Sequence, residues 1–436
     1  MNRSFQQLRH LIESGAADRG FVRLYGTSTL ASQKQRYRTM LDWADKHLSG
    51  STPVFISAPG RTELGGNHTD HNNGRVLAAA VDLDCVALVC PNKDMTVNLF
   101  SDEFDRSIRV DLTSLEPQEA ERETPEALVR GVAHAQVRKS LAIRGFSGIV
   151  DSTCKPGSGL SSSAAFSVLA AATFAKVCAN HLDPLALAQS ARYAENVFFG
   201  KPCGLMDQMS SAVGEIIGID FKNPEEPVIT RITADFDSTE FQLVIVDTGS
   251  SHAELTHEYA AIPTEIKAAL KIFDKSIARG LTMPEILHRA SEIRAEAGDR
   301  ALLRLMHFVS EDERAGKQSE ALQQGRITDY LELVQQSGET SCNLLQNCVP
   351  SSENRSQGIL LALALTKQIC PDGYCRVHGG GFAGTIQAYI PRKRIDHYER
   401  FMKSVFGDRA VIRVRTGRPG ISVLSKGGWH FPADER

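Results

Sequence analysis

The sequence predicts a two-domain α+β protein, and three observations carry that prediction. The chain has 436 residues, which suits two domains of comparable size better than one core. Strand and helix patterns interleave without the strict strand–helix–strand rhythm of a doubly wound sheet. A Pro-rich, acidic stretch at residues 223–236 is typical of a link between domains. We therefore expect an N-terminal helical extension at 1–50, a first domain at 51–228 and a second at 229–436.

The elements of the first half follow from their apolar spacing. Helical periodicity runs through the first fifty residues, for example at Leu8, Leu11 and Ile12. PVFISAPGR predicts a short strand that ends in a turn, and GFSGIVDST predicts a strand before a Gly/Ser-rich loop and a long helix. Asp183-Pro184 begins another helix, expected to run to about Phe199. Further strands are expected at 76–91, 95–100 and 107–115, and a further helix at 124–143.

The second half begins with a buried strand, FQLVIVDTG, followed by a mostly helical stretch at 253–345. YCRVHGGGFAGTIQAYI predicts a strand, a glycine turn and a second apolar segment. RIDHYERFMKSVFG has the spacing of an amphipathic helix. The segments AVIRVRTG and GISVLS are expected to be closing strands of this domain.

Composition indicates a cytoplasmic enzyme. The net charge of −3 gives no reason to expect nucleic acid or an anionic membrane as a partner. The most apolar stretch, residues 160–178, is interrupted by Lys176 and is weak for a membrane span. Nine cysteines occur without a CxxC pair, so we expect reduced thiols that act as small apolar residues. We expect a monomer or a weak homodimer.

KPGSGLSSSAAF, residues 155–166, is the most informative local feature. Gly157 and Gly159 allow a tight turn and a close approach to a ligand. The helix that follows presents free N–H groups and a dipole that favour phosphate, and three serines add hydroxyls for phosphate or a divalent cation. No Gly-Lys-Ser/Thr closes the loop, so it is not a Walker A sequence. An ordinary loop that caps a helix is the alternative.

Two polar segments are candidates for the chemistry. CGLMDQMSSAVG contains Asp207 beside Gly204 and Met206, which indicates a helix cap or a buried acid. APGRTELGGNHTDHNNG gathers charged and polar groups on a glycine-rich loop, which suits a polyhydroxylated ligand. A solvated turn or a zinc site at His68, Asp70 and His71 are the alternatives. A third segment, RVHGGGFAG, predicts a close backbone approach to a nucleotide or to another loop.

Together these segments resemble the galactokinase branch of the superfamily of galacto-, homoserine, mevalonate and phosphomevalonate kinases. The three motifs occur in the family's order, and AENVFFGKPCGLMDQ is similar to the galactokinase form of the catalytic segment. VDTGSSHAELTHEY is a weaker match. The resemblance covers about residues 53–425. It implies a first domain like ribosomal protein S5 domain 2, a ferredoxin-like second domain and an active site in the cleft between them.

The resemblance also implies a role for each matching residue. Asp207 would be the catalytic base, and Arg61 the arginine that pairs with it and lowers its pKa. Ser163 and Glu195 would bind Mg²⁺. The ATP phosphates would lie on Gly157, Ser158, Gly159, Leu160, Ser161, Ser162 and Ser163. The sugar would contact Glu63, Asn67, His68, Thr69, Asp70, Gly204 and Tyr259. The partners implied are a small sugar and MgATP, and the reaction implied is galactose to galactose 1-phosphate.

The signature departs from the family at one pair of positions. Galactokinases usually carry Glu where this chain has Asn67, and Asn where it has Glu63. We hypothesise that the two residues have exchanged tasks, so that Glu63 supplies the charged acceptor for a sugar hydroxyl. The arginines usual after Tyr259 are also absent, and the segment TSCNLLQNCVP matches only loosely.

These departures leave two alternatives open. One is a kinase of the same fold for arabinose, N-acetylgalactosamine or a galacturonate, and a carboxylate on the sugar would suit Asn67 better than Glu. The other is a catalytically silent sugar sensor. The intact serine loop and the presence of Asp207 argue against the sensor.

Overall fold

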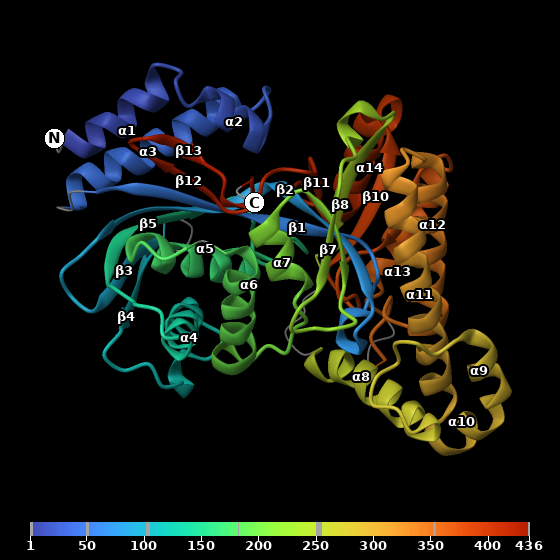
Figure 1. The fold of residues 1–436 in the computed structure, drawn as a ribbon. Helices are drawn as coiled ribbons and strands as arrows, with labels where there is room; N and C mark the ends of the chain where they lie inside the picture. Colours follow the sequence, from blue (N-terminus) through green and yellow to red (C-terminus); the bar gives the residue numbers. More distant parts are fainter. Residues whose placement is uncertain are drawn as a thin grey trace.

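The computed structural model of the protein describes residues 3–48, 52–101, 105–181, 183–249, 255–351 and 355–434. Its strands form two sheets that lie beside each other, each covered by helices (Figure 1). In the described residues the larger sheet has nine strands, in the order β13-β12-β1-β2-β5-β3-β4, with β6 and β7 attached beside β2. The smaller sheet has four, in the order β11-β8-β10-β9. The expected α+β class is confirmed.

The larger sheet is antiparallel except for the pair β3–β5. Its two longest strands pair through most of their length. The register of this pair shifts between Pro59 and Arg61 and again between Glu63 and Gly65. Its strands are β1 Val54–Gly65, β2 Arg75–Pro91, β3 Thr96–Ser101, β4 Arg106–Asp111, β5 Phe146–Ser152, β6 Ile216–Asp220, β7 Val228–Ile232, β12 Ser422–Ser425 and β13 Gly428–His430.

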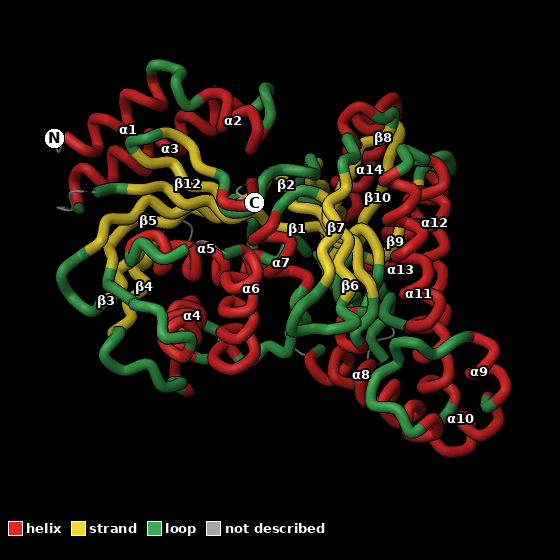
Figure 2. Tube along the Cα trace, in the orientation of Figure 1, coloured by secondary structure: helices red, strands yellow, loops and turns green. Residues whose placement is uncertain are grey.

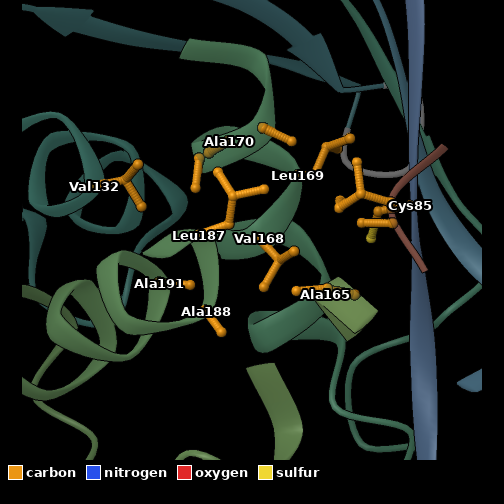
Figure 3. Packing of buried hydrophobic residues seen from close by; sticks show 14 of the residues in the cluster. Cys85, Val132, Ala165, Val168, Leu169, Ala170, Leu187, Ala188 and Ala191 are labelled. Atoms are coloured by element: carbon orange, nitrogen blue, oxygen red, sulfur yellow. The ribbon is translucent and has the colours of Figure 1, made fainter. Parts of the chain in front are cut away.

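Helices cover both faces of this sheet (Figure 2). One face carries α4 Pro125–Arg138, α5 Ser162–Val177, α6 Pro184–Tyr193 and α7 Met206–Val213. Figure 3 shows part of this core, where Val132, Val168 and Leu187 bring α4, α5 and α6 together. The other face carries α1 Arg3–Glu13, α2 Asp18–Tyr25 and α3 Leu30–His47, so the predicted helical extension closes a second core against the sheet.

The smaller sheet has the ferredoxin-like topology that the resemblance implied. Its strands are β8 Phe241–Asp247, β9 Tyr374–Val377, β10 Thr385–Pro391 and β11 Val411–Arg413, and all neighbours are antiparallel. Helices occupy the connections β8–β9 and β10–β11, which gives the strand–helix–strand–strand–helix–strand pattern. The helices are α8 Thr256–Leu270, α9 Met283–His288, α10 Ala290–Ala297, α11 Asp299–Gln323, α12 Ile327–Thr340, α13 Gly358–Ile369 and α14 Ile395–Phe406.

The closing segment departs from the expected domain boundaries. The predicted linker contains β7, which pairs with β6 in the larger sheet. The predicted closing strand at 420–425 is β12, and it pairs with β1 instead of joining the second sheet. The chain therefore leaves the first sheet after β7, builds the second, and returns. The strand at 54–65 is also longer than expected and has no terminal turn at Arg61, because every residue in it is buried between layers.

Two further findings concern the cysteines and the membrane. Cys342 and Cys348 form a disulfide, so the expectation of nine reduced thiols is wrong for this pair; the remaining seven cysteines are not disulfide-bonded. Cys342 lies in the π-helical turn Ser341–Leu345 that follows α12, and Cys348 lies six residues further along the chain. No helix in the described part of the chain is long and apolar enough to cross a membrane.

Candidate active site

Asp207 and Arg61 form the centre of the site. Asp207 lies in the first turn of α7, and Arg61 projects from β1. Arg61 Nε donates to Oδ1 and Nη2 donates to Oδ2, each at 2.6 Å, while Ser161 Oγ donates to Oδ2 at 2.7 Å. Burial alone would raise the pKa of Asp207, but the charge of Arg61 and these hydrogen bonds hold it below its usual range. The carboxylate is therefore ionised at neutral pH.

Residues 157–163, here called the phosphate loop, lie directly against this pair. Arg61 Nη1 donates to the carbonyl of Gly159 at 2.6 Å, and the Arg61 backbone N–H donates to that of Leu160 at 3.0 Å. Ser161 adopts a left-handed conformation, and α5 begins at the next residue. The first N–H groups of a helix have no partner within it, so this end favours an anion. The loop and the carboxylate therefore share one anchor, Arg61.

The two glycines of the loop face different surroundings. Both have positive φ, +78° at Gly157 and +74° at Gly159, which L side chains rarely adopt. A Cβ on Gly159 would lie 2.3 Å from Thr385 Oγ1 and 2.8 Å from His378 Nδ1, both from the second domain. A Cβ on Gly157 would meet nothing within 4 Å. Gly159 is therefore needed for packing, whereas Gly157 leaves open space of the kind that a phosphate occupies.

Ser163 and Glu195 come together beside the loop. Ser163 Oγ donates to Glu195 Oε2 at 3.1 Å, and Gln208 Nε2 donates to the other oxygen at 2.9 Å. Glu195 lies in the π-helical turn Ala194–Phe199 and is 1% exposed, and burial raises the pKa of its carboxyl. Two oxygens about 3 Å apart match neighbouring corners of an octahedron with bonds of about 2.0–2.1 Å. The pair therefore fits Mg²⁺, whose charge would offset the cost of burying this carboxylate.

Residues 65–74, here called the sugar loop, lie on the glycine turn at residues 379–382. Asn67 Nδ2 donates to the carbonyl of Gly379 at 2.7 Å, and His68 Nε2 lies 2.9 Å from that of Gly380. Tyr259, from α8, donates to the carbonyl of Gly381 at 2.9 Å. The turn's carbonyls therefore hold side chains of the site in place. The third motif packs against another loop, one of the two roles predicted for it.

His68 and Asp70 differ in what they leave available. Burial lowers the pKa of His68 to about 3, so the ring is neutral. Because a carbonyl can only accept, Nε2 carries the proton and Nδ1 is left as an acceptor. Asp70 lies against the backbone of Gly204, where an added Cβ would come within 1.7 Å of Oδ2. The structure thus brings Asp70 to the segment that carries Asp207.

Three predicted sugar contacts have interior partners instead. Thr69 Oγ1 donates to the carbonyls of Gly66 and Arg75 at 2.9 and 2.5 Å, which closes the sugar loop on itself. Glu63 is 3% exposed and forms an ion pair with Arg376, which is fully buried. Asn67 is 1% exposed and bonds to Glu63. Leu160, predicted in the phosphate loop, is also buried, and it takes part through its backbone carbonyl.

Sequence reasoning missed several residues that shape the site. Glu311 and His307 from α11 bind the sugar loop's backbone, and His378 packs under Gly159. No sequence feature of α11 indicated that it contributes to the site, because its polar residues look like the exposed face of an amphipathic helix. His378 lies inside the third motif, and its position next to three glycines was the available signal. Within the described residues, no three His, Cys, Asp or Glu side chains are grouped so that they could hold a metal ion.

Comparisons with known proteins agree with this geometry. Residues 46–91 match the galactokinase galactose-binding signature, and residues 127–215 match the GHMP kinases N terminal domain. A galactokinase of Actinobacillus pleuropneumoniae serotype 3 is 29% identical over 365 residues, covering 82% of this chain and 90% of the relative. A galactokinase of Chloroflexus aggregans is 29% identical over 380 residues, covering 85% and 90%. The chain is therefore similar to galactokinases over most of its length, and it carries two segments that match models of the galactokinases and the GHMP kinases.

Solved structures show the same fold. The structure of Lactococcus lactis galactokinase complexed with galactose superimposes with a TM-score of 0.76 at 22% identity, covering 88% of this chain and 98% of that one. A mevalonate kinase superimposes with a TM-score of 0.58 at 15% identity, covering 84% and 99%. The expected fold and the expected resemblance to galactokinases are therefore confirmed, and the chain spans nearly the whole length of these relatives.

Proposed function

We propose that this chain is an ATP-dependent sugar kinase that phosphorylates the anomeric hydroxyl of galactose, giving galactose 1-phosphate and ADP. The observation that carries the proposal is the Asp207 carboxylate, held by Arg61 and placed next to the phosphate loop. A base beside an anion-binding helix end is the arrangement that phosphoryl transfer to a hydroxyl requires. The match of residues 46–91 to a galactose-binding signature and the galactokinase relatives support galactose as the sugar.

Asp207 and Arg61 would divide the chemistry at the acceptor. Asp207 Oδ2 already accepts from the Ser161 hydroxyl, which shows that it can accept from an alcohol at hydrogen-bonding distance. A sugar hydroxyl in that position would pass its proton to the carboxylate as its oxygen bonds to the γ-phosphorus of ATP. Arg61 keeps the carboxylate ionised until that step, and its charge also favours the transferring phosphoryl group.

The second substrate is proposed to be MgATP. The phosphate loop would take the phosphates through the N-terminus of α5 and the open side of Gly157. Ser163 and Glu195 would hold Mg²⁺, which supplies charge neutralisation on the phosphates when bound. For the sugar, the structure offers His68 Nδ1 and the Asp70 carboxylate beside Gly204. Together these groups supply acceptors for several hydroxyls, as a sugar requires.

A coupled ADP-release assay with MgATP and a panel of sugars tests this proposal. The panel contains galactose, N-acetylgalactosamine, arabinose, galacturonate, glucose and fucose. We expect rapid turnover with galactose, with the product identified as the 1-phosphate by ³¹P NMR. Turnover with another sugar alone would keep the kinase and replace the substrate. Failure with every sugar, together with retained sugar binding, would favour the silent sensor.

A further inference from the structure

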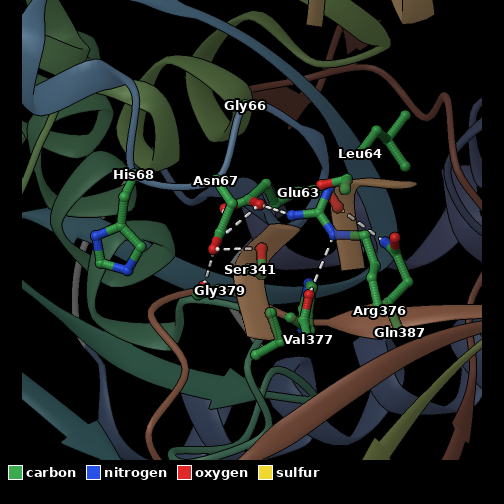
Figure 4. Close-up of polar contacts among 12 residues, drawn as sticks. Glu63, Leu64, Gly66, Asn67, His68, Ser341, Arg376, Val377, Gly379 and Gln387 are labelled. Atoms are coloured by element: carbon green, nitrogen blue, oxygen red, sulfur yellow. Dashed lines mark hydrogen bonds and ion pairs between the residues drawn. The ribbon is translucent and has the colours of Figure 1, made fainter. Parts of the chain in front are cut away.

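Asn67 is the most connected residue of the sugar loop, and all its hydrogen-bonding capacity is taken up by protein. Figure 4 shows it between Glu63, Gly379 and Ser341. Its Nδ2 donates to Gly379 O at 2.7 Å and to Glu63 Oε1 at 3.1 Å. Its Oδ1 accepts from Asn347 Nδ2 at 2.9 Å and from Ser341 Oγ at 3.3 Å. An amide has two donor hydrogens and two acceptor lone pairs, so none remains for a sugar.

The backbone of Asn67 is bound by residues of the second domain. Its N–H donates to Glu311 Oε1 at 3.2 Å, next to the Gly66 N–H at 3.1 Å. Its carbonyl lies 3.1 Å from Nε2 of His307, one turn earlier on α11. Burial opposes ionisation of Glu311, but Arg314 beside it lowers the pKa of its carboxyl to about 2. Helix α11 of the second domain therefore forms hydrogen bonds with the peptide groups on both sides of Asn67.

An amide suits this position and a carboxylate does not. The two groups that face Nδ2 are a carbonyl and the Glu63 carboxylate, and both need a donor. A carboxylate at position 67 would present only acceptors to them and would place two like charges in a buried space. Glu63 itself is committed to Arg376. With Asn and Glu exchanged between the two positions, Asn67 and Glu63 therefore form a hydrogen-bonded pair in the protein interior. The exchange does not move a sugar contact from one residue to the other.

We infer that Asn67 is a positioning residue that holds the sugar loop against the second domain and does not contact the sugar. This inference rests on the proposed sugar-kinase function of the same site. It assigns sugar contact to the neighbouring residues His68 and Asp70, whose geometry Asn67 sets through the backbone. A positioning residue affects every accepted sugar alike, whereas a residue that contacts one hydroxyl changes the preference between sugars. The two roles therefore differ in a measurable way.

The Asn67→Asp variant keeps the shape and removes both donated bonds. We expect its KM to rise by about tenfold or more for each sugar that the wild type accepts, by the same factor, with the KM for MgATP unchanged. Asn92→Asp is the matched control: Asn92 Nδ2 also donates two bonds, to Thr96 O and Ser147 Oγ, but lies in the turn after β2.

A changed preference between galactose and another sugar in Asn67→Asp would overturn the inference, as would an unchanged KM. A milder variant, Ser341→Ala, removes only one donor to Oδ1 and should raise all sugar KM values together by a smaller factor. If the wild type phosphorylates no sugar, the proposed function fails, but this inference can still be tested by hydrogen exchange. Asn67→Asp should then speed exchange in residues 64–74 and leave residues 155–165 as in the wild type; equal exchange in the sugar loop would reject it.

Discussion

Arg61 holds Asp207 by both carboxylate oxygens, with Nε on Oδ1 and Nη2 on Oδ2 at 2.6 Å each. Such a bidentate pair fixes both the orientation and the charge of the carboxylate. The same guanidinium donates through Nη1 to the carbonyl of Gly159 in the phosphate loop. A single side chain therefore ties the position of the proposed base to the position of the proposed ATP site.

Asp207→Asn should abolish turnover and leave nucleotide binding nearly intact. The amide keeps the shape and can still accept from Ser161, but it cannot take a proton from an attacking hydroxyl. Loss of a general base costs on the order of 10²–10⁴ in rate. Single-turnover phosphorylation and titration with a non-hydrolysable ATP analogue separate the two effects. A variant that retains more than a few per cent of activity would exclude Asp207 as the base.

Replacing Arg61 should move the acid limb of the pH profile of kcat/KM to higher pH. Arg61 lowers the pKa of Asp207 below its ordinary value, so the ionised form persists to below about pH 4 in the wild type. The stability that this pair contributes is present above the unfolded pKa and is lost as pH falls through the folded pKa. In Arg61→Met only the Ser161 hydrogen bond and the charge of Lys201 still oppose the effect of burial on the pKa of Asp207, so the limb should move to higher pH. The measurement is kcat/KM for the sugar from pH 4 to 9; an unmoved limb would contradict this role.

Ser163→Ala should raise the magnesium concentration needed for half-maximal rate. The variant removes one of two oxygens that fit the metal, while Glu195 stays in place. Burial raises the pKa of Glu195, so protons should compete with the metal and the wild-type requirement should increase as pH falls. Ser167→Ala is the control, because Ser167 Oγ donates to the Ser163 carbonyl inside the same helix. Equal magnesium dependence in both variants would place the ligand elsewhere in the loop.

The sequence could predict the elements and the core of the site because both depend on local signals. Gly157 and Gly159 precede the start of α5, and Asp207 lies in the first turn of α7, so their places in the fold follow from residues a few positions apart. The return of β12 to the first sheet could not be predicted, because a four-residue strand carries no sign of which partner it will join. That pairing depends on contacts between residues far apart in the sequence, such as Leu424 and Phe55.

The direction in which a polar side chain points was also beyond the sequence. Asn67 and Thr69 alternate with His68 and Asp70 in one loop, and all four are of types that bind sugars. Which of them turn inward depends on Glu311 and on the glycine turn, more than two hundred residues away in the chain. His68 takes a left-handed φ of 61°, which separates its side chain from its neighbours. Such a conformation is uncommon outside glycine, and although His adopts it more often than most residues, the residue type alone does not predict it.

Gly204→Ala and Gly157→Ala should affect different substrates. A Cβ at Gly204 would come within 1.7 Å of Asp70 Oδ2, so Asp70 must move and the sugar KM should rise. A Cβ at Gly157 meets no atom within 4 Å, but φ of +78° strains any L side chain there, at a cost of about 1 kcal/mol. That strain falls on the phosphate loop and should raise the KM for MgATP. Initial rates measured with each substrate varied in turn give the KM for the sugar and the KM for MgATP of both variants. If Gly204→Ala raised the KM for MgATP and Gly157→Ala raised the KM for the sugar, the proposed positions of sugar and phosphate would be reversed.

Reduction of the Cys342–Cys348 disulfide should weaken sugar binding more than nucleotide binding. The two cysteines bracket a segment whose Asn347 and adjoining Ser341 both donate to Asn67 Oδ1. The backbone carbonyl of Asn347 also accepts from the Phe382 N–H in the glycine turn. Releasing this short segment restores backbone freedom worth about 1–2 kcal/mol per residue that loosens, so a rise in sugar KM of roughly tenfold is expected.

The measurement compares sugar and MgATP KM values before and after treatment with dithiothreitol. Thiol titration of the unfolded, unreduced chain should give seven reactive cysteines, and nine after reduction. Cys342→Ser should behave like the reduced wild type and should not respond to dithiothreitol, whereas Cys178→Ser, which removes a free cysteine on the far end of α5, should respond fully. Nine reactive thiols before reduction would show that the pair is not formed, and an unchanged sugar KM after reduction would show that the segment holds Asn67 without it.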